Sequence, residues 1–257
     1  MNAHVLIIDA LNLIRRVDAA RRIHAAGGGT GSSVDACVQS LARALSECAP
    51  SHAVCVFEGK GSSFRAALYP EYKAGRAPMP ADLEESLPAI RKAFLGIGVT
   101  SIEVNAVEAD DIIATLATKI EAGKLHARIL STDKIFLQLL SDRIRVRDHF
   151  AKKDLNQAYV FEKFQVHSTQ LADLLALAGD PTNSIPGVPS VGRKTAARLL
   201  QEYGALENIL SNTPRIGGRL GRIIAAHKDD ALVFRRLMLL KKNIDLGLNL
   251  MDFRYRR

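Results

Sequence analysis

Three short, unbroken runs of mainly apolar residues, each closing on an acid, constrain the fold of this chain most strongly. The runs are HVLIID at residues 4–9, HAVCVFE at 52–58 and ARILSTD at 127–133. Each is too short for a helix and lacks the alternation of a half-exposed strand, a pattern typical of strands buried on both faces of a parallel sheet. The sequence therefore predicts three buried parallel strands, each with an acid at its carboxyl end.

Helical patterns separate these strands. Apolar residues at spacings of three and four indicate helices at 34–47, 83–95 and 112–121. Residues 144–148 alternate apolar residues with arginine, and we expect an edge strand there. Because strands and helices alternate, the expected fold class is α/β with a parallel, doubly wound sheet. The glycine-rich stretch at 25–33 is interpreted as a linker or loop tip without chemistry.

The chain changes character near residue 168, where the strand pattern ends. Apolar periodicity and capping residues predict helices at 169–178, 193–203, 206–210 and, with breaks, 218–240. We therefore divide the chain into a core at residues 1–167 and a small helical module at 168–257.

Basic charge is concentrated in the second part of the chain. Residues 1–150 hold 18 basic and 17 acidic side chains and residues 151–257 hold 17 and 10, so the net charge of +8 divides into +1 and +7. Such a surface suits a polyanion, because each phosphate contact releases counterions, although a basic surface kept for solubility is the alternative. The absence of Trp favours contact with a nucleic-acid backbone over base reading.

Cysteine usage and hydropathy bear on where the protein works. The three cysteines, Cys37, Cys48 and Cys55, form no CxxC pair and no cluster with histidine, which favours a reducing compartment. No stretch approaches the ~20 apolar residues that span a bilayer. We expect a cytoplasmic, soluble protein with no membrane partner, and nothing in the sequence indicates a protein partner.

Acids from distant segments are predicted to meet at one edge of the sheet. Parallel strands end at the same edge, where α/β folds bind ligands, so Asp9, Glu58 and Asp133 should lie together there. Taken singly, an acid after a strand is more often a turn or cap residue. Three strands that end in this way favour a shared site.

The sequence EADD at a helix start adds Glu108, Asp110 and Asp111 to this group. Alone, these three would be explained by stabilisation of the helix dipole. Six carboxylates in one crevice would raise one another's pKa unless cations neutralised them. Since no His or Cys accompanies them, we expect an all-oxygen site that holds Mg²⁺, with Mn²⁺ as a substitute.

Five motifs together resemble the 5′ nuclease family, the 5′-3′ exonucleases and flap endonucleases that process branched DNA. They occur in family order across nearly the whole chain. They are LIIDALNL at 6–13, VFEGKGSSFRAALYPEYKAGRAPMP at 56–80, EADDIIATLA at 108–117, STDK at 131–134 and LALAGDPTNSIPGVPSVGRKTAARLL at 175–200. The closest resemblance is to the stand-alone bacterial flap endonucleases.

This resemblance implies a PIN-like nuclease core with an arch at residues 64–82 and a Mg²⁺-dependent phosphodiesterase that cleaves 5′ flaps or frayed 5′ ends of DNA. The six acids would hold divalent metal at the scissile phosphate. Lys73 and Arg76 of the arch would be catalytic, because a cation beside the phosphate neutralises charge that develops in the transition state. Arg65, Tyr69 and Tyr72 would stack on or grip the unpaired 5′ strand.

Three positions depart from the family pattern. Ile135 and Asn183 stand where the family usually has aspartate, so its outer metal site looks dismantled although Asp180 remains. Glu58 replaces the family's aspartate and reaches one methylene further. The resemblance therefore implies one intact metal cluster and weak or absent exonuclease action relative to cleavage at a branch.

The segment IPGVPSVGRKTAARLL resembles the helix–three-turn–helix of 5′ nucleases, a variant of the helix-hairpin-helix that grips DNA without reading its sequence. By resemblance, K⁺ would be held on the backbone carbonyls of Leu177, Ala178, Pro186, Val188 and Val191. DNA would contact Ser190, Val191, Gly192, Arg193, Lys194 and Thr195. The ordinary alternative is a helix hairpin with a structural role only.

Two other functions stay open. A branched-DNA-binding protein with a decayed nuclease would account for Ile135 and Asn183, but the complete set of Asp9, EADD and Asp133 opposes decay. A PIN-type ribonuclease would need the acids and not the helical hairpin, and IPGVPSVGRKTA opposes it.

Overall fold

The computed structural model describes residues 4–26 and 32–256. The glycine-rich stretch interpreted above as a linker lies largely outside the described residues. Among the described residues, no helix is long and apolar enough to cross a membrane.

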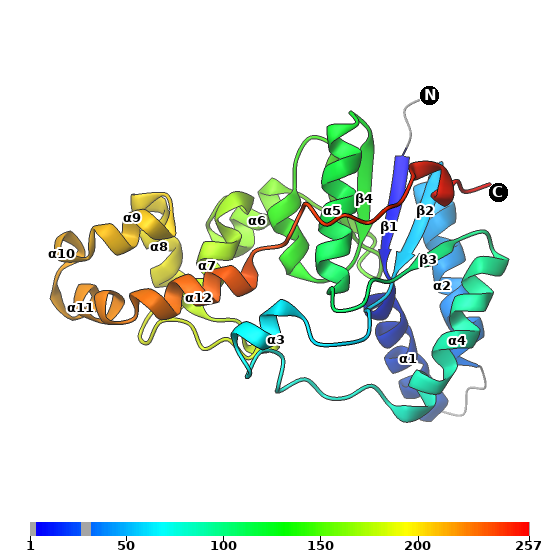
Figure 1. The fold of residues 1–257 in the computed structure, drawn as a ribbon, viewed down its shortest axis with the longest axis horizontal. Coiled ribbons are helices and arrows are strands. Elements are labelled where there is room, and N and C mark those ends of the chain that lie inside the picture. The colour runs from blue at the N-terminus through cyan, green and yellow to red at the C-terminus, as the bar shows by residue number, and fades with distance from the viewer. Residues whose placement is uncertain (1–3, 27–31, 257) are drawn as a thin grey trace.

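A six-stranded sheet forms the centre of the molecule, in the order β3-β2-β1-β4-β5-β6 (Figure 1). All neighbouring strands are parallel except β6, which is antiparallel to β5. The strands are β1 (His4–Asp9), β2 (His52–Val56), β3 (Thr100–Ile102), β4 (His126–Leu130), β5 (Ile144–Asp148) and β6 (Lys153–Leu155). The predicted α/β fold with a parallel sheet is confirmed. The prediction that 144–148 is an edge strand is wrong, because the short β6 pairs with its outer side.

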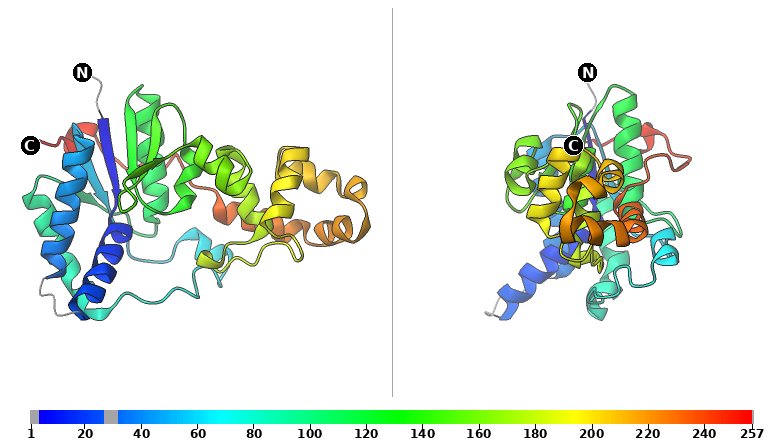
Figure 2. Two further views of the ribbon diagram at one scale, coloured as in Figure 1. Left: turned by 180° about the vertical axis from the view of Figure 1, so that it is seen from behind. Right: turned by 90° about the vertical axis from the view of Figure 1, so that its left-hand side faces the viewer.

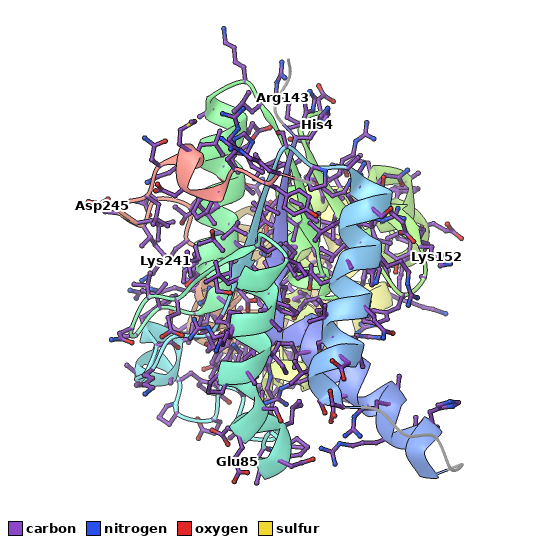
Figure 3. All side chains as sticks on the ribbon, turned by 90° about the vertical axis from the view of Figure 1, so that its right-hand side faces the viewer. His4, Glu85, Arg143, Lys152, Lys241 and Asp245 are labelled. Atoms are coloured by element: carbon purple, nitrogen blue, oxygen red, sulfur yellow. The ribbon has the colours of Figure 1, made fainter. Side chains whose placement is uncertain are left out.

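Helices cover both faces of the sheet, as the unbroken apolar strands require. In β1, Leu6 and Ile8 face one core and Val5 and Ile7 the other. The first core is closed by α1 (Ala10–Ala26), α2 (Ser33–Cys48) and α4 (Ala81–Gly96), of which α2 and α4 lie side by side (Figure 3). The second core contains α5 (Ala109–Ala122) and extends without a break into the helices that follow the sheet.

The arch, predicted at residues 64–82, runs below the carboxyl edge of the sheet between β2 and α4 (Figure 1), and its last two residues are the first two of α4. It begins with a short helix, α3 (Phe64–Leu68), whose start is capped by the hydroxyl of Ser63. Turns follow as far as Arg76. Lys73 among them has a φ of 60°, the left-handed region that residues other than glycine rarely adopt.

The helix α6 (Gln157–Phe164) follows the sheet, and the helices after it extend away from the sheet as an elongated module (Figure 2). They are α7 (Leu171–Ala178), α8 (Arg193–Tyr203), α9 (Leu206–Ser211), α10 (Thr213–Ile216), α11 (Gly218–Ala226) and α12 (Lys228–Met238). The helices predicted after residue 168 are confirmed, and the stretch 218–240 is broken, as predicted, between α11 and α12, whereas α10 was not predicted.

The last residues of the chain leave this module and return to the sheet. Beyond α12 the chain passes along α5 to β2 (Figure 1), where Tyr255 N–H donates to the carbonyl of Ser51 at 3.0 Å. Thr100 Oγ1 donates to the carbonyl of Asp252 at 3.2 Å. The helical module therefore ends at Met238, and the division of the chain at residue 168 stays a prediction.

Candidate active site

A cavity of about 510 Å³ opens at the carboxyl edge of the sheet. Four carboxylates line it together with three cations and several smaller groups. The lining residues are Asp9, Leu11, Asn12, Arg15, Glu58, Lys73, Arg76, Ala77, Ala109, Asp110, Asp133 and Thr182. The structure thus brings four of the six predicted acids, and both predicted catalytic cations, to one place.

The fold explains how these four acids meet. Asp9 is the last residue of β1, Glu58 lies two residues beyond β2, and Asp133 lies three residues beyond β4. Since these strands are parallel neighbours, their ends share one edge. Asp110 comes from the first turn of α5, and Glu58 Oε2 holds that turn by accepting from Ala109 N–H at 3.1 Å.

Asp9 is the most buried of the four acids, with an exposed fraction of 8%. Burial raises its pKa to about 6, and the negative charges of Asp133 and Glu58 add to the effect. Hydrogen bonds oppose the rise, from Ser131 Oγ at 2.8 Å and from Asn12 N–H at 3.2 Å. Ser131 and Asn12 were not identified by sequence reasoning, although both lie within motifs that carry the family resemblance.

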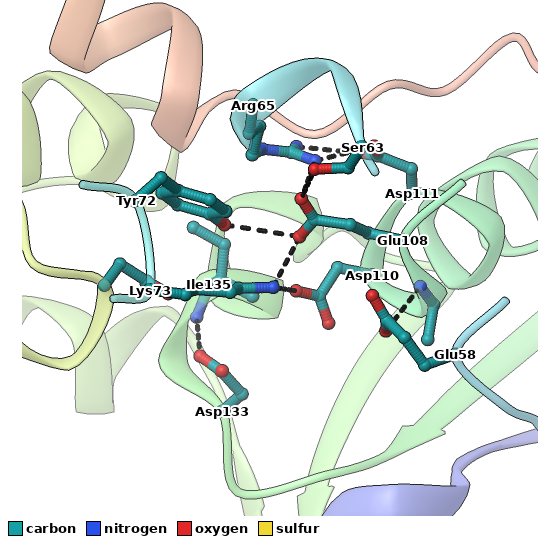
Figure 4. A network of polar contacts seen from close by, with 12 residues as sticks. Glu58, Ser63, Arg65, Tyr72, Lys73, Glu108, Asp110, Asp111, Asp133 and Ile135 are labelled. Atoms are coloured by element: carbon teal, nitrogen blue, oxygen red, sulfur yellow. Dashed lines mark hydrogen bonds and ion pairs between the residues drawn. The ribbon is translucent and has the colours of Figure 1, made fainter. Parts of the chain in front are cut away.

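Asp110 stands at the centre of the group. Burial raises its pKa well above the ordinary value, Asp133 and Asp9 raise it further, and Lys73 lowers it. Lys73 Nζ lies 4.0 Å from Asp110 Oδ2 (Figure 4). The cavity therefore concentrates negative charge that one nearby lysine neutralises only in part.

Glu108 is turned away from this cavity. Its carboxylate accepts from Ser63 Oγ at 2.5 Å, from Lys73 Nζ at 2.5 Å and from Tyr72 OH at 3.3 Å (Figure 4). Lys73 therefore bridges Glu108 and Asp110. Glu108 does not line the cavity and its contacts hold the arch, whereas its place among the metal ligands stays a prediction.

Asp111 also lies outside the cavity. Its two carboxylate oxygens accept from Arg65 at 2.7 and 2.8 Å, and one of them also accepts from Lys241 N–H at 2.8 Å. Successive residues of a helix point about 100° apart, and here Asp110 lines the cavity while Asp111 faces Arg65. Glu108 and Asp111, three residues apart, are neighbours as expected, but they meet around Arg65.

The burial of the arch residues corrects a second expectation. Arg65 is 2% exposed and Tyr72 is 8% exposed, so neither can grip an unpaired strand in this structure. Tyr69 packs edge-on against Phe234 of α12, with 5.8 Å between ring centroids. These side chains attach the arch to α5 and α12.

The described residues contain no group of three or more Asp, Glu, His or Cys side chains arranged to hold one ion without movement. Burial is the main cause of the raised pKa values of Asp9 and Asp110, and repulsion among Asp9, Asp110 and Asp133 adds to it. Such repulsion separates carboxylates that a cation would draw together.

Two of the three residues that depart from the family pattern, Ile135 and Asn183, have structural roles. Ile135 is 7% exposed and belongs to the second core, while its N–H donates to Asp133 Oδ1 at 2.8 Å. Asn183 is 6% exposed. Its carboxamide donates to Asp180 Oδ2 at 2.6 Å and accepts from Arg76 at 2.8 Å.

A second cavity, of about 300 Å³, adjoins the first. The two share Asn12, Asp133 and Thr182, and the second continues past Asn183 to Arg193 at the start of α8. A continuous lined surface therefore connects the acids with the helical module.

The start of α8 presents unpaired backbone N–H groups. Gly192 precedes the helix without a side-chain cap, and Gly192, Arg193 and Lys194 are exposed. Ser190 is exposed with a φ of 65°, whereas Val191 is 3% exposed, so that only the backbone of Val191 can face a ligand. Such a helix start is suited to bind phosphate.

The turn before α8 is held by direct contact between backbones. Gly179 and Gly187 have φ of 82° and 73°, and a Cβ on Gly187 would lie 2.3 Å from Gly179 N. Leu177 O accepts from Val188 N–H at 2.8 Å. The five residues expected to hold K⁺ thus surround a tight backbone crossing.

Comparisons with known proteins agree with this architecture. A family model described as 5′-3′ exonuclease, N-terminal resolvase-like domain, matches residues 4–165, and one described as 5′-3′ exonuclease, C-terminal SAM fold, matches residues 166–257. Flap endonuclease Xni of Cronobacter sakazakii is 41% identical over 256 residues, with 99% of each chain covered. The protein of that name from Aeromonas hydrophila is 40% identical over 260 residues, covering 98% of this chain and 96% of its own.

Solved structures share the fold. A T5 5′-exonuclease with bound zinc ions superposes with a TM-score of 0.78 at 21% identity, over 93% of this chain and 90% of that chain. A T5 flap endonuclease in a pseudo-enzyme–product complex with DNA and metal ions gives a TM-score of 0.76 at 22% identity, over 93% and 89%. The two family models together span the described chain, and the relatives match its whole length. The chain belongs to the 5′-3′ exonuclease family.

Proposed function

We propose that this chain is a divalent-metal-dependent flap endonuclease that cleaves DNA near the base of a 5′ flap, with weak or absent exonuclease action. Its substrate would be branched DNA inside the cell, bound without regard to sequence. The observation that carries the proposal is the cavity in which Asp9, Glu58, Asp110 and Asp133 meet three cations. The relatives named flap endonuclease, similar over the whole chain, support the same activity.

The four acids fit a hard divalent cation. They offer carboxylate oxygens only, which suits Mg²⁺ or Mn²⁺ better than Zn²⁺. Burial and, to a smaller extent, the charges of Asp133 and Glu58 raise the pKa of Asp9, and a bound cation would offset both effects. The chemistry that such a cation supplies is activation of the attacking water and stabilisation of charge on the departing oxygen.

The side chains around the acids position the substrate. Lys73 and Arg76 stand on the arch side of the cavity and Arg15 on the α1 side, where its guanidinium donates to the carbonyl of Ala77 at 3.4 Å. These cations would hold the scissile phosphate between them and neutralise the charge that develops on it. The Lys73–Glu108 contact fixes the ammonium group 4.0 Å from Asp110 Oδ2.

The duplex part of the substrate would bind the helical module. The exposed N–H groups and cations of Gly192, Arg193 and Lys194 are suited to one phosphate strand. K⁺ on the carbonyls of the turn before α8 would bring a positive charge to the same strand. Replacing K⁺ by a bulky organic cation at constant ionic strength should then weaken DNA binding, with cleavage of bound DNA unaffected.

One assay tests the proposed function. Labelled 5′-flap DNA, a matched single strand and an RNA hairpin are each incubated with Mg²⁺ or with EDTA. The proposal requires metal-dependent cutting near the flap junction. Binding without cutting would identify a decayed nuclease, and cutting of RNA alone would identify a PIN-type ribonuclease. Asp110→Asn, which removes one charge and keeps the shape, should abolish cutting but retain flap binding.

A further inference from the structure

Two segments more than one hundred residues apart are joined beside the candidate active site. Lys73 N–H donates to the backbone carbonyl of Asn183 at 3.0 Å, and Gly75 N–H donates to Ser184 Oγ at 3.1 Å. The segment that receives these bonds is a tight turn at 180–184 in the helical module. The arch is therefore attached to the module at the point where it passes the cavity.

The arginine of the arch completes this attachment. Arg76 donates from Nε to the carbonyl of Thr182 at 3.3 Å and from Nη2 to Asn183 Oδ1 at 2.8 Å. Arg76 and Thr182 both line the 510 Å³ cavity. The attachment thus fixes a cation at the wall of the candidate active site.

The carboxamide of Asn183 is matched to both of its partners. Its Oδ1 accepts from a guanidinium, which has no acceptor, and its Nδ2 donates to the carboxylate of Asp180, which has no donor. An aspartate at 183 would still accept from Arg76 but would face Asp180 with a second negative charge. An alanine would make neither bond. Only an amide of this length satisfies both neighbours in this buried position.

The backbone of the arch supports a fixed role for the attachment. Lys73 is held with a φ of 60°, a conformation that a residue with a side chain keeps only where its surroundings impose it. The bond from Lys73 N–H to Asn183 is one such constraint, and the bond from Lys73 Nζ to Glu108 is another. Both are present in the protein without DNA.

We propose that Asn183 is a positioning residue that anchors the arch to the helical module and so places Lys73 and Arg76 at the cavity before DNA binds. The catalytic consequence rests on the proposed function, whereas the anchoring does not. Because the cations are already in place, the arch loses no further conformational entropy on the way to the transition state.

Hydrogen exchange of the full-length protein, without metal or DNA, tests the anchoring. Asn183→Ala removes the bond from Arg76, and Asn183→Asp sets a second negative charge against Asp180 within the turn that receives the arch. Each variant should therefore speed exchange of the peptide that covers residues 70–78 by about tenfold or more. Peptides from β1 and α5 should exchange as before. Glu71→Gln, an exposed change within the arch, should leave the rate unaltered and serves as the matched control. Unaltered exchange in both Asn183 variants would overturn the proposal.

Cleavage kinetics then separate positioning from mere structural support. On flap DNA, Asn183→Asp should lower kcat by about tenfold and change KM by less than about threefold. The double variant Asn183→Ala with Arg76→Gln should have a kcat only slightly below that of Arg76→Gln alone, because both changes remove the same contact. Additive losses would contradict a shared role.

Manganese titration tests the alternative that residue 183 is a position where a metal ligand has been replaced. If Asn183→Asp bound one more Mn²⁺ than the wild type and cleaved faster, the residue would be a replaced metal ligand and not an anchor, and the proposal would fail. A wild type that cleaves no flap would refute the proposed function, while the exchange experiment would still decide the anchoring.

Discussion

Arg65 and Asp111 form a buried, bidentate ion pair that joins the arch to α5, with both side chains about 2% exposed. Arg65 also donates to the carbonyls of Leu237 and Leu239 at 2.7 and 2.9 Å. One guanidinium therefore connects three segments, the arch, the helix that carries Asp110, and the end of α12. Its charge is satisfied in the core, and it is not available to DNA.

This arrangement predicts opposite outcomes for two adjacent aspartates. Asp111→Asn should lower the free energy of unfolding by about 3–5 kcal/mol, because it leaves a buried guanidinium charge uncompensated. Asp110→Asn should leave stability equal to or above that of the wild type and abolish cleavage. Chemical denaturation and flap cleavage, measured on both variants, check this difference.

A double variant provides the control. Arg65→Met with Asp111→Leu removes both charges and should recover most of the stability that Asp111→Asn loses. If Asp111→Asn were as stable as the wild type and as the double variant, but no longer cleaved flap DNA, Asp111 would belong to the metal site.

The raised pKa of Asp9 predicts a gain in stability on neutralisation. The pKa is about 6 in the folded protein against an ordinary value of 3.8, so the folded state holds this proton more tightly than the unfolded chain does. The loss of folding stability that results from ionising Asp9 is absent below pH 4, grows as the pH rises toward 6, and is complete above pH 6. At about 1.36 kcal/mol per pH unit, Asp9→Asn should stabilise the metal-free protein at pH 7.5 by up to about 3 kcal/mol.

Urea unfolding in EDTA measures this gain at two pH values. The difference between Asp9→Asn and the wild type should be largest at pH 7.5 and smaller at pH 5. A variant less stable than the wild type at pH 7.5 would mean that the bonds from Ser131 and Asn12 outweigh the burial of the charge.

Lys73 is expected to act on turnover more than on affinity. Removing its ammonium group leaves the developing phosphate charge with one cation fewer, so Lys73→Met should lower kcat by about 100-fold and change KM by less than about threefold. Lys92→Met, an exposed lysine of α4, is the matched control and should behave as the wild type. Unchanged kcat in Lys73→Met would remove this residue from the mechanism.

The start of α8 is expected to act on affinity and on its salt dependence. Arg193→Ala with Lys194→Ala should weaken flap binding and lower the slope of log Kd against log salt concentration by about 2, if each cation contacts one phosphate. The control pair, Lys119→Ala with Lys124→Ala, lies at the far end of α5. If both double variants had the same slope of log Kd against log salt concentration, the duplex would not bind at the start of α8.

The strand ends of the sheet were predictable from the sequence because each depends on a local pattern. Asp9, Glu58 and Asp133 follow short apolar runs, and the parallel topology then brings their side chains to one cavity. The helical module was predictable for the same reason, since its helices carry clear apolar periodicity. The strands β3 and β6, of three residues each, are too short to leave such a pattern.

The roles of Glu108 and Asp111 could not be predicted from their spacing alone. Acids in the first turn of a helix point in different directions, and which of them faces the cavity depends on the partners that tertiary packing supplies. Arg65 comes from a segment too irregular to be assigned, and its buried position becomes visible only once α3 is packed between α5 and α12. The contacts of Asn183 depend in the same way on the meeting of two distant turns.

Four acids from four segments are proposed to share one divalent metal. Manganese binding, followed by electron paramagnetic resonance, decides whether they do. The wild type and the control Asp142→Asn, an exposed acid, should bind Mn²⁺ alike. Affinity should fall by about tenfold or more, equivalent to about 1.4 kcal/mol, in each of Asp9→Asn, Glu58→Gln, Asp110→Asn and Asp133→Asn. Wild-type affinity in those four variants would contradict the claim.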